Sequence, residues 1–188
     1  DMSISPSLLT NAQCIFDTIV YFDQLPLHVL PWSASGNISD SSKRLSSRTN
    51  ILKIVALFST PFEYTLYLDG DTAPCHTFPY APFAQLNKGH MFITKNPFGY
   101  QSTNEKPLYK SAPNHPQNAA FPEPNGGVIG FRWTAQTEQW LTRALELIPF
   151  FHKLGFDQDQ IFMRHALFEE MQLYGLKVAS QPMRRYCR

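Results

Sequence analysis

Two carboxylates, Asp69 and Asp71, directly follow the apolar and aromatic segment at residues 64–68. Residues two apart in an extended chain point to the same side, so both side chains can face one ligand. Gly70 between them has no side chain, which lets a ligand approach the backbone closely. Hard oxygen ligands suit Mg²⁺ or Mn²⁺, and such an ion can bridge a diphosphate and offset its charge. The triplet therefore predicts a metal site for a substrate that contains phosphate.

The same triplet has a simpler interpretation as a turn. Asp-Gly is a strong hairpin signal, and acidic residues at strand ends are often solvated turn residues. Pro74 makes a poor return strand, which argues against a hairpin. An EF-hand is excluded because Thr72 and Ala73 stand where its loop needs a further acidic ligand.

The strands that must position these carboxylates are predicted from clusters of β-branched and aromatic residues. Strands are expected at residues 16–23, 64–68, 91–94, 126–133 and 176–180. The 64–68 segment is almost wholly apolar, as expected for a strand that is covered on both faces. The strands alternate with helices, which predicts an α/β fold, with a mostly parallel sheet flanked by helices, in a single domain over residues 1–188.

Three helices are expected from caps and from apolar residues at helical spacing. Ser46 or Ser47 can cap the first helix, and Pro61 stops it. Thr134 can cap the second, and Asp159 can open a third that runs to about Met171. The apolar positions of the first helix are Ile51, Leu52, Val55 and Phe58, and those of the second are Trp140, Leu141, Ala144, Leu145, Ile148 and Phe151. His165, Trp133 and Trp140 are interpreted as structural residues.

The composition limits the classes of function. The chain has 188 residues, is 43% hydrophobic and carries a net charge of +1. A core of ordinary size is therefore expected, and nucleic-acid binding by a basic face is not indicated. No apolar run approaches the length of a membrane span. The three cysteines are far apart in the sequence, so no zinc-binding pair is expected. The sequence does not decide whether two of them form a disulfide.

Three blocks of sequence, in order, resemble the nucleotide-diphospho-sugar glycosyltransferases of the GT-A fold, of the glycogenin-like family 8 type. Residues 46–75, SSRTNILKIVALFSTPFEYTLYLDGDTAPC, look like the family's metal-binding segment, in which a basic helix precedes a strand that ends in Asp-any-Asp. Residues 121–132, FPEPNGGVIGFR, resemble the Asn-small-Gly-Val segment that lines the donor-sugar pocket. Residues 157–167, DQDQIFMRHAL, resemble an Asp-Gln pair followed by a helix. The resemblance covers about residues 44–188.

This resemblance implies roles for residues of all three blocks. Asp69 and Asp71 would hold Mn²⁺ or Mg²⁺. Asp159 would contact sugar hydroxyls and stabilise positive charge at the anomeric carbon, which makes it the catalytic candidate. The implied substrate-binding residues are Arg48, Lys53, Gly70, Asn125, Gly126, Gly127, Asp159 and Gln160.

Each of these roles has a plainer alternative. Arg48 and Lys53 could belong to a solvated helix face, and Asp159 could be a helix N-cap. Asp157 with the glutamine after it is the competing match to the Asp-Gln pair. Gly126 stands where the family usually has Thr or Ser, which removes a hydroxyl from the implied sugar contacts.

The resemblance implies a metal-dependent glycosyltransferase, a hexosyl- or pentosyltransferase. It would move a sugar from a UDP- or GDP-sugar to a hydroxyl of a carbohydrate, protein or lipid acceptor. One alternative is a non-catalytic relative that binds nucleotide-sugar or carbohydrate. Another is a glycosidase that uses Asp69 with Asp159.

The two ends of the chain bear on this interpretation. Family members normally begin with a strand–helix–strand unit that holds the base. Residues 7–26, SLLTNAQCIFDTIVYFDQLP, look like the region just after that unit, so the expectation is that this sequence lacks it. The family also usually supplies a further metal ligand, and this sequence ends at Arg188 before a residue that matches it. The expectation is a fragment of a longer protein, for which inactivity in isolation is one outcome. The compartment stays open between the Golgi lumen and the cytoplasm.

Overall fold

The computed structural model describes residues 51–70, 72–74, 81–95, 124–154, 159–181 and 186–187. The strand predicted at 16–23 lies outside the described residues, as do Arg48, Asp71 and Asp157.

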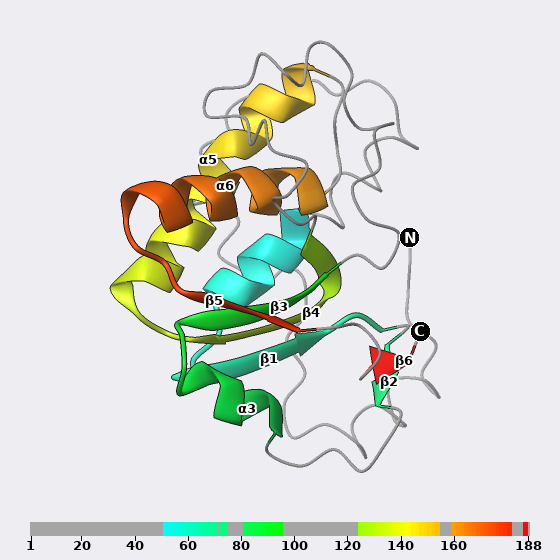
Figure 1. The fold of residues 1–188 in the computed structure, drawn as a ribbon. Coiled ribbons are helices and arrows are strands. Elements are labelled where there is room, and N and C mark those ends of the chain that lie inside the picture. Colours follow the sequence, from blue (N-terminus) through cyan, green and yellow to red (C-terminus); the bar gives the residue numbers. More distant parts are fainter. Residues whose placement is uncertain are drawn as a thin grey trace.

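A four-stranded sheet with the order β1-β4-β3-β5 lies at the centre of the described structure (Figure 1). Its strands are β1 (Tyr64–Leu68), β3 (Met91–Lys95), β4 (Pro124–Arg132) and β5 (Val178–Gln181). β4 pairs antiparallel with both β1 and β3, and β3 pairs parallel with β5. The predicted α/β class is therefore confirmed in its coarse form, as a mixed sheet with helices.

The prediction of a mostly parallel sheet is wrong for the described strands. Alternation of strands and helices constrains direction only where a helical crossover joins two neighbouring strands. The connection from β3 to β5 contains two long helices, and this pair is parallel. β4 is inserted between β1 and β3 in the opposite direction, which no local pattern in the sequence indicates.

Three short elements were not predicted. β2 (Ala73–Pro74) pairs antiparallel with β6 (Tyr186–Cys187), and α3 (Ala81–Leu86) is a helix of six residues. β1 does not return into β2 as a hairpin, in agreement with the expectation from Pro74.

The two long helices are α5 (Ala135–Lys153) and α6 (Asp159–Leu173), and residues 51–58 are also helical. Thr134 caps α5 as predicted. Its hydroxyl accepts from the Thr137 N–H at 3.2 Å, and the Thr137 hydroxyl accepts from the Thr134 N–H at 2.8 Å. These reciprocal bonds satisfy two backbone donors at the start of the helix. Within the described ranges, no helix is both long and apolar enough to cross a membrane.

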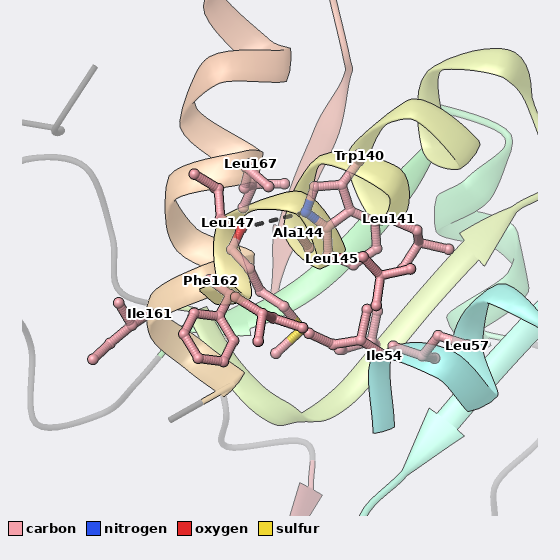
Figure 2. Packing of buried hydrophobic residues seen from close by; sticks show 14 of the residues in the cluster. Ile54, Leu57, Trp140, Leu141, Ala144, Leu145, Leu147, Ile161, Phe162 and Leu167 are labelled. Carbon is pink, nitrogen blue, oxygen red and sulfur yellow. Dashed lines mark hydrogen bonds between the residues drawn. The ribbon is translucent and has the colours of Figure 1, made fainter. Parts of the chain in front are cut away.

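The main core lies between one face of the sheet and these three helices (Figures 1 and 2). The whole apolar face predicted for α5 is buried there. Trp140 is fully buried, and its indole N–H donates to the carbonyl oxygen of Met163 at 3.3 Å, which ties α5 to α6 (Figure 2). His165 is also fully buried, with its ring 4.8 Å from that of Phe151. The structural interpretation of Trp140 and His165 fits these positions.

A smaller core covers the other face of the sheet, on the side of α3. Alternate residues of the central strands divide between the two cores, because successive side chains of a strand point to opposite faces. Phe92 and Val128 face the smaller core, whereas Ile93 and Ile129 face the larger one. β1 reaches both cores but stays half-buried or exposed, because it lies at the edge of the described sheet. The expectation of a strand covered on both faces therefore holds only in part.

The helix over residues 51–58 buries a slightly different stripe from the one predicted. Ile51 and Val55 are buried as expected, but Ile54 and Leu57 are buried in place of Leu52 and Phe58, which are only partly buried. The helix is rotated so that the stripe centres on Ile54.

Gly130 makes room for the ring of Phe92 across the β3–β4 pair. The two residues are register partners, and a Cβ on Gly130 would lie 2.1 Å from the nearest ring carbon of Phe92. Phe92 is fully buried and cannot move outward without leaving the smaller core. We expect Gly130→Ala to lower the free energy of unfolding by about 2 kcal/mol, because the extra methyl group overpacks this contact. Urea denaturation measures the change.

Gly70→Ala is the matched control, since a Cβ at Gly70 would meet no atom within 4 Å. Its unfolding free energy should change by less than about 0.5 kcal/mol. Equal effects of the two substitutions would contradict the packing described for Phe92.

Candidate functional site

The ammonium group of Lys53 contacts two carboxylates that come from distant parts of the chain. Its Nζ lies 3.0 Å from Asp69 Oδ1 and 2.7 Å from Asp159 Oδ2. It also donates to the carbonyl oxygen of Gly126 at 3.4 Å and lies 5.4 Å from the centre of the Tyr67 ring. One cation therefore joins the helix over 51–58, the end of β1, the start of β4 and the start of α6.

The antiparallel direction of β4 brings the second sequence block to the first. Leu68, the last residue of β1, pairs with Val128, and the ladder continues one step because the Asp69 N–H donates to the Gly127 carbonyl at 2.9 Å. A parallel β4 would place Arg132, at its far end, beside the end of β1 instead. The carboxylate that follows β1 therefore meets the segment from Asn125 to Gly127.

Gly127 has no side chain at a point where two oxygen atoms converge. A Cβ there would lie 2.9 Å from Asn125 Oδ1 and 3.1 Å from Asp69 Oδ2. Asn125 is only 3% exposed, and its Oδ1 accepts from the Gly127 N–H at 2.8 Å. Thr94 donates its hydroxyl to the Asn125 carbonyl at 3.3 Å, which fixes this strand end to β3. The amide oxygen and the carboxylate are thus held beside the same glycine.

Gly126 gives the same kind of access to the ion pair. A Cβ at this position would lie 2.9 Å from Asp159 Oδ2, 3.1 Å from Met163 Cε and 3.3 Å from Lys53 Nζ. The space that a serine or threonine side chain would begin to fill is therefore occupied here by the Lys53–Asp159 pair. This is a physical reason for glycine at the position where the resembled family has a hydroxyl.

Asp159 is the first residue of α6 and is only 7% exposed. A carboxylate in the first turn is stabilised by the positive end of the helix dipole. Its Oδ2 contacts the Lys53 ammonium at 2.7 Å, which links the start of α6 to the helix over residues 51–58. Gln160 follows on the first turn of α6 and is half-buried.

The charges of this cluster leave a net negative excess. Burial by itself would lower the pKa of Lys53, but the charge and hydrogen bond of Asp159, and then those of Asp69, outweigh burial and raise this pKa above its ordinary value of 10.5. Lys53 is therefore a cation at neutral pH. Two carboxylates around one ammonium leave one unbalanced negative charge, which favours a further cation nearby.

Asp69 is positioned by a residue that the sequence interpretation missed. The Tyr67 hydroxyl donates to Asp69 Oδ1 at 2.6 Å, the same oxygen that Lys53 contacts. Tyr67 stands two residues before Asp69 in an extended segment, so period-two spacing could have identified it. Asp69 Oδ2 is directed instead toward the open side of Gly127.

The structure brings most of the predicted site residues together. These are Lys53, Asp69, Asn125, Gly126, Gly127 and Asp159. Gly70 is exposed and follows Asp69 at the start of a turn, in which the Thr72 N–H donates to the Asp69 carbonyl at 2.9 Å. This hydrogen bond supports the turn interpretation of the triplet, and the ligand interpretation stays a prediction. Arg48 and Asp71 lie outside the described residues, so their predicted roles stay predictions.

The donor set suits a hard divalent cation, although it is incomplete in the described part. Asp69 Oδ2 is a carboxylate oxygen beside a glycine where a Cβ would crowd it, with an amide oxygen also close to that glycine. Oxygen ligands of these kinds fit Mg²⁺ or Mn²⁺. Among the described residues, no group of three or more acidic, histidine or cysteine side chains is placed to hold a metal ion.

Comparison with known proteins identified no relative of this chain. No protein-family model, curated protein or solved structure matches the chain. The functional inference therefore depends on the residues of the cluster and on the resemblance of its three sequence blocks.

Removal of the bridging ammonium should destabilise the fold. Lys53→Met leaves two carboxylates close together without their counter-ion, and we expect the free energy of unfolding to fall by about 2 kcal/mol at pH 7. Because the pKa of Lys53 is raised, its contribution is fully present below pH 10.5 and is lost only as the pH rises through that raised value. Urea denaturation at pH 7 and pH 9 should therefore give the same difference.

Lys153→Met tests the loss of an exposed lysine at the end of α5. It should change stability by less than about 0.5 kcal/mol. A Lys53→Met protein as stable as the wild type would show that the ammonium does not hold the cluster together.

Proposed function

We propose that the chain carries the donor site of a metal-dependent glycosyltransferase, which moves a sugar from a nucleotide-diphosphate sugar to an acceptor hydroxyl. The supporting observation is the Lys53 cluster. Asp69, the Asn125–Gly127 segment and Asp159 come from three separate sequence blocks, each of which resembles a donor-site segment, and they meet around one ammonium group. A chance resemblance of three unrelated segments gives no reason for them to meet.

Asp69 and, by resemblance, Asp71 would hold the Mn²⁺ or Mg²⁺. The ion supplies charge neutralisation for the diphosphate that departs with the nucleotide. The unbalanced negative charge of the cluster supports binding of such a cation. Tyr67 keeps Asp69 in place by its hydrogen bond to Oδ1, which leaves Oδ2 for the ligand side.

Lys53 would bind the diphosphate directly. Its ammonium is charged at neutral pH and is already held at the strand ends, so a phosphate oxygen beside it gains a charge-assisted hydrogen bond. Arg48, by resemblance, would supply a second cation for the diphosphate.

The sugar would lie against the start of β4 and the start of α6. Gly126 and Gly127 let a sugar approach the backbone, and Gly70 does the same at the turn. Asn125, Asp159 and Gln160 would bind sugar hydroxyls. Asp159 is the catalytic candidate, because its carboxylate can stabilise positive charge that develops at the anomeric carbon.

The glycosidase alternative is less well supported by the geometry. That chemistry needs a scissile bond between the two carboxyl groups, one of which donates a proton. Asp69 and Asp159 instead share the Lys53 ammonium, which occupies the position between their oxygens. A non-catalytic relative remains the second candidate, since a donor site without an acceptor site would bind nucleotide-sugar and not turn it over.

Metal and nucleotide should bind together, and the binding should depend on the acidic triplet. Titration of Mn²⁺ with UDP into the wild-type chain should release or absorb measurable heat. Asp69→Asn and Asp71→Asn should each weaken the binding by at least about tenfold, because each removes a carboxylate ligand. Isothermal titration calorimetry measures both.

Glu63→Gln is the matched control, since Glu63 is an exposed carboxylate just before the other end of β1. The affinity of the Glu63→Gln variant for Mn²⁺ with UDP should equal that of the wild type. Metal–nucleotide binding that survives both aspartate substitutions would refute the proposed site.

Turnover separates the three candidate functions. A transferase should release UDP or GDP from a nucleotide-sugar panel in the presence of acceptors, lose this activity with EDTA and regain it with Mn²⁺. A coupled assay of nucleotide release measures it. Hydrolysis of aryl glycosides that EDTA does not affect would identify a glycosidase. Nucleotide-sugar binding without release in the complete gene product would identify a non-catalytic relative.

A further inference from the structure

A cavity between α5 and α6 lies far from the Lys53 cluster. Its volume is about 280 Å³, and its lining includes charged residues of both helices and two apolar residues at the end of α6. Glu169 is ten residues along α6 from Asp159, which corresponds to about 15 Å along the helix axis. The cavity is therefore separate from the proposed donor site. Among its lining residues are Arg143, Glu146, Glu169, Glu170, Leu173 and Tyr174.

One guanidinium group in this cavity is shared by two carboxylates. Arg143 donates through Nη2 to Glu169 Oε1 at 3.2 Å and through Nη1 to Glu146 Oε2 at 3.1 Å, and its Nε also donates to Glu169. These contacts connect α5 to α6. They leave the third carboxylate of the cavity, that of Glu170, without a share of the Arg143 hydrogen bonds.

Glu170 is a buried carboxyl group with an unpaired oxygen. The residue is only 2% exposed, and its Oε2 has no hydrogen-bond partner in the part of the chain that the structure describes. A buried carboxylate without a partner is costly, and native proteins rarely leave such an atom unpaired. Burial, and then the neighbouring charge of Glu169, raises the pKa of Glu170 to about 7. The charged groups that influence it are Glu169 on its own helix and Arg143 and Glu146 on α5.

The lining favours an organic cation over a metal ion. In the described ranges, no three acidic, histidine or cysteine side chains are arranged to hold a metal. Leu173 and Tyr174 are 62% and 52% exposed at the same cavity, so they offer apolar surface on which a ligand can pack. A tyrosine ring can also receive a cationic group on its face.

We propose that this cavity is a binding site for a guanidinium or primary ammonium group carried on a short apolar stem. The cationic head binds at Glu170, whose Oε2 has no hydrogen-bond partner among the described residues, and the stem packs on Leu173 and Tyr174. This site is independent of the donor site, and its failure would leave the proposed glycosyl transfer untouched.

The direct test is a titration with N-butylguanidinium, followed by calorimetry or NMR, in parallel with N-butylurea. Urea is a neutral group of the same shape, so it separates charge recognition from apolar contact. The cation should bind at least ten times more tightly than the urea. Its affinity should rise from pH 6 to pH 8, because Glu170 loses its proton over that range. Glu170→Gln should lower the affinity for the cation by at least tenfold and remove this pH dependence of the affinity.

Glu138→Gln is the matched control, because Glu138 is exposed in the first turn of α5 and does not line the cavity. It should bind the cation as the wild type does. Glu170→Gln removes a buried charge, so its thermal midpoint at pH 8 should be no lower than that of the wild type, which shows that the variant is folded. Absence of cation binding, equal binding of the urea, or unchanged binding by Glu170→Gln would each overturn the proposal.

Discussion

The arrangement of the candidate site depends on one half-buried cation. Lys53 touches Asp69 and Asp159, whose carboxylates would otherwise repel each other at the end of the sheet, and it reaches the backbone of Gly126 as well. Gly126 and Gly127 leave room for this arrangement because they lack side chains. A Cβ at either position would press on a carboxylate oxygen, so the two glycines and the ammonium form one steric and electrostatic unit.

The core explains why this cation stays in place. Lys53 projects from the helix over residues 51–58, whose Ile54 and Leu57 are buried against the sheet and the long helices (Figure 2). α6, which carries Asp159, packs on α5 and on β4, and the Trp140–Met163 hydrogen bond joins the two helices. Lys53 and Asp159 are thus mounted on helices, and Asp69 directly follows β1. Regular elements hold a site more accurately than loops do. The antiparallel β1–β4 pair then sets Asp69 beside Gly127.

The sequence was informative where a property is local. Caps and apolar spacing located α5 and α6, and residue clusters located β1, β3 and β4, because these patterns depend on neighbours in the chain. The same local signals could not indicate that β4 runs antiparallel between β1 and β3, or that β1 is an edge strand. The acidic triplet singled out Asp69, and the resemblance to glycosyltransferases singled out Lys53 and Asp159. Neither showed that one ammonium joins the three residues, since that contact depends on long-range packing. Glu170 gave no sequence signal, because its burial depends on how α5 and α6 meet.

The most direct measurement is anomalous X-ray diffraction from crystals of the chain grown with Mn²⁺ and UDP. The account predicts a manganese peak within coordination distance of Asp69 Oδ2, close to Gly127, with the diphosphate on the Lys53 side of the metal. A manganese peak elsewhere, or a nucleotide bound away from the Lys53 cluster, would contradict it.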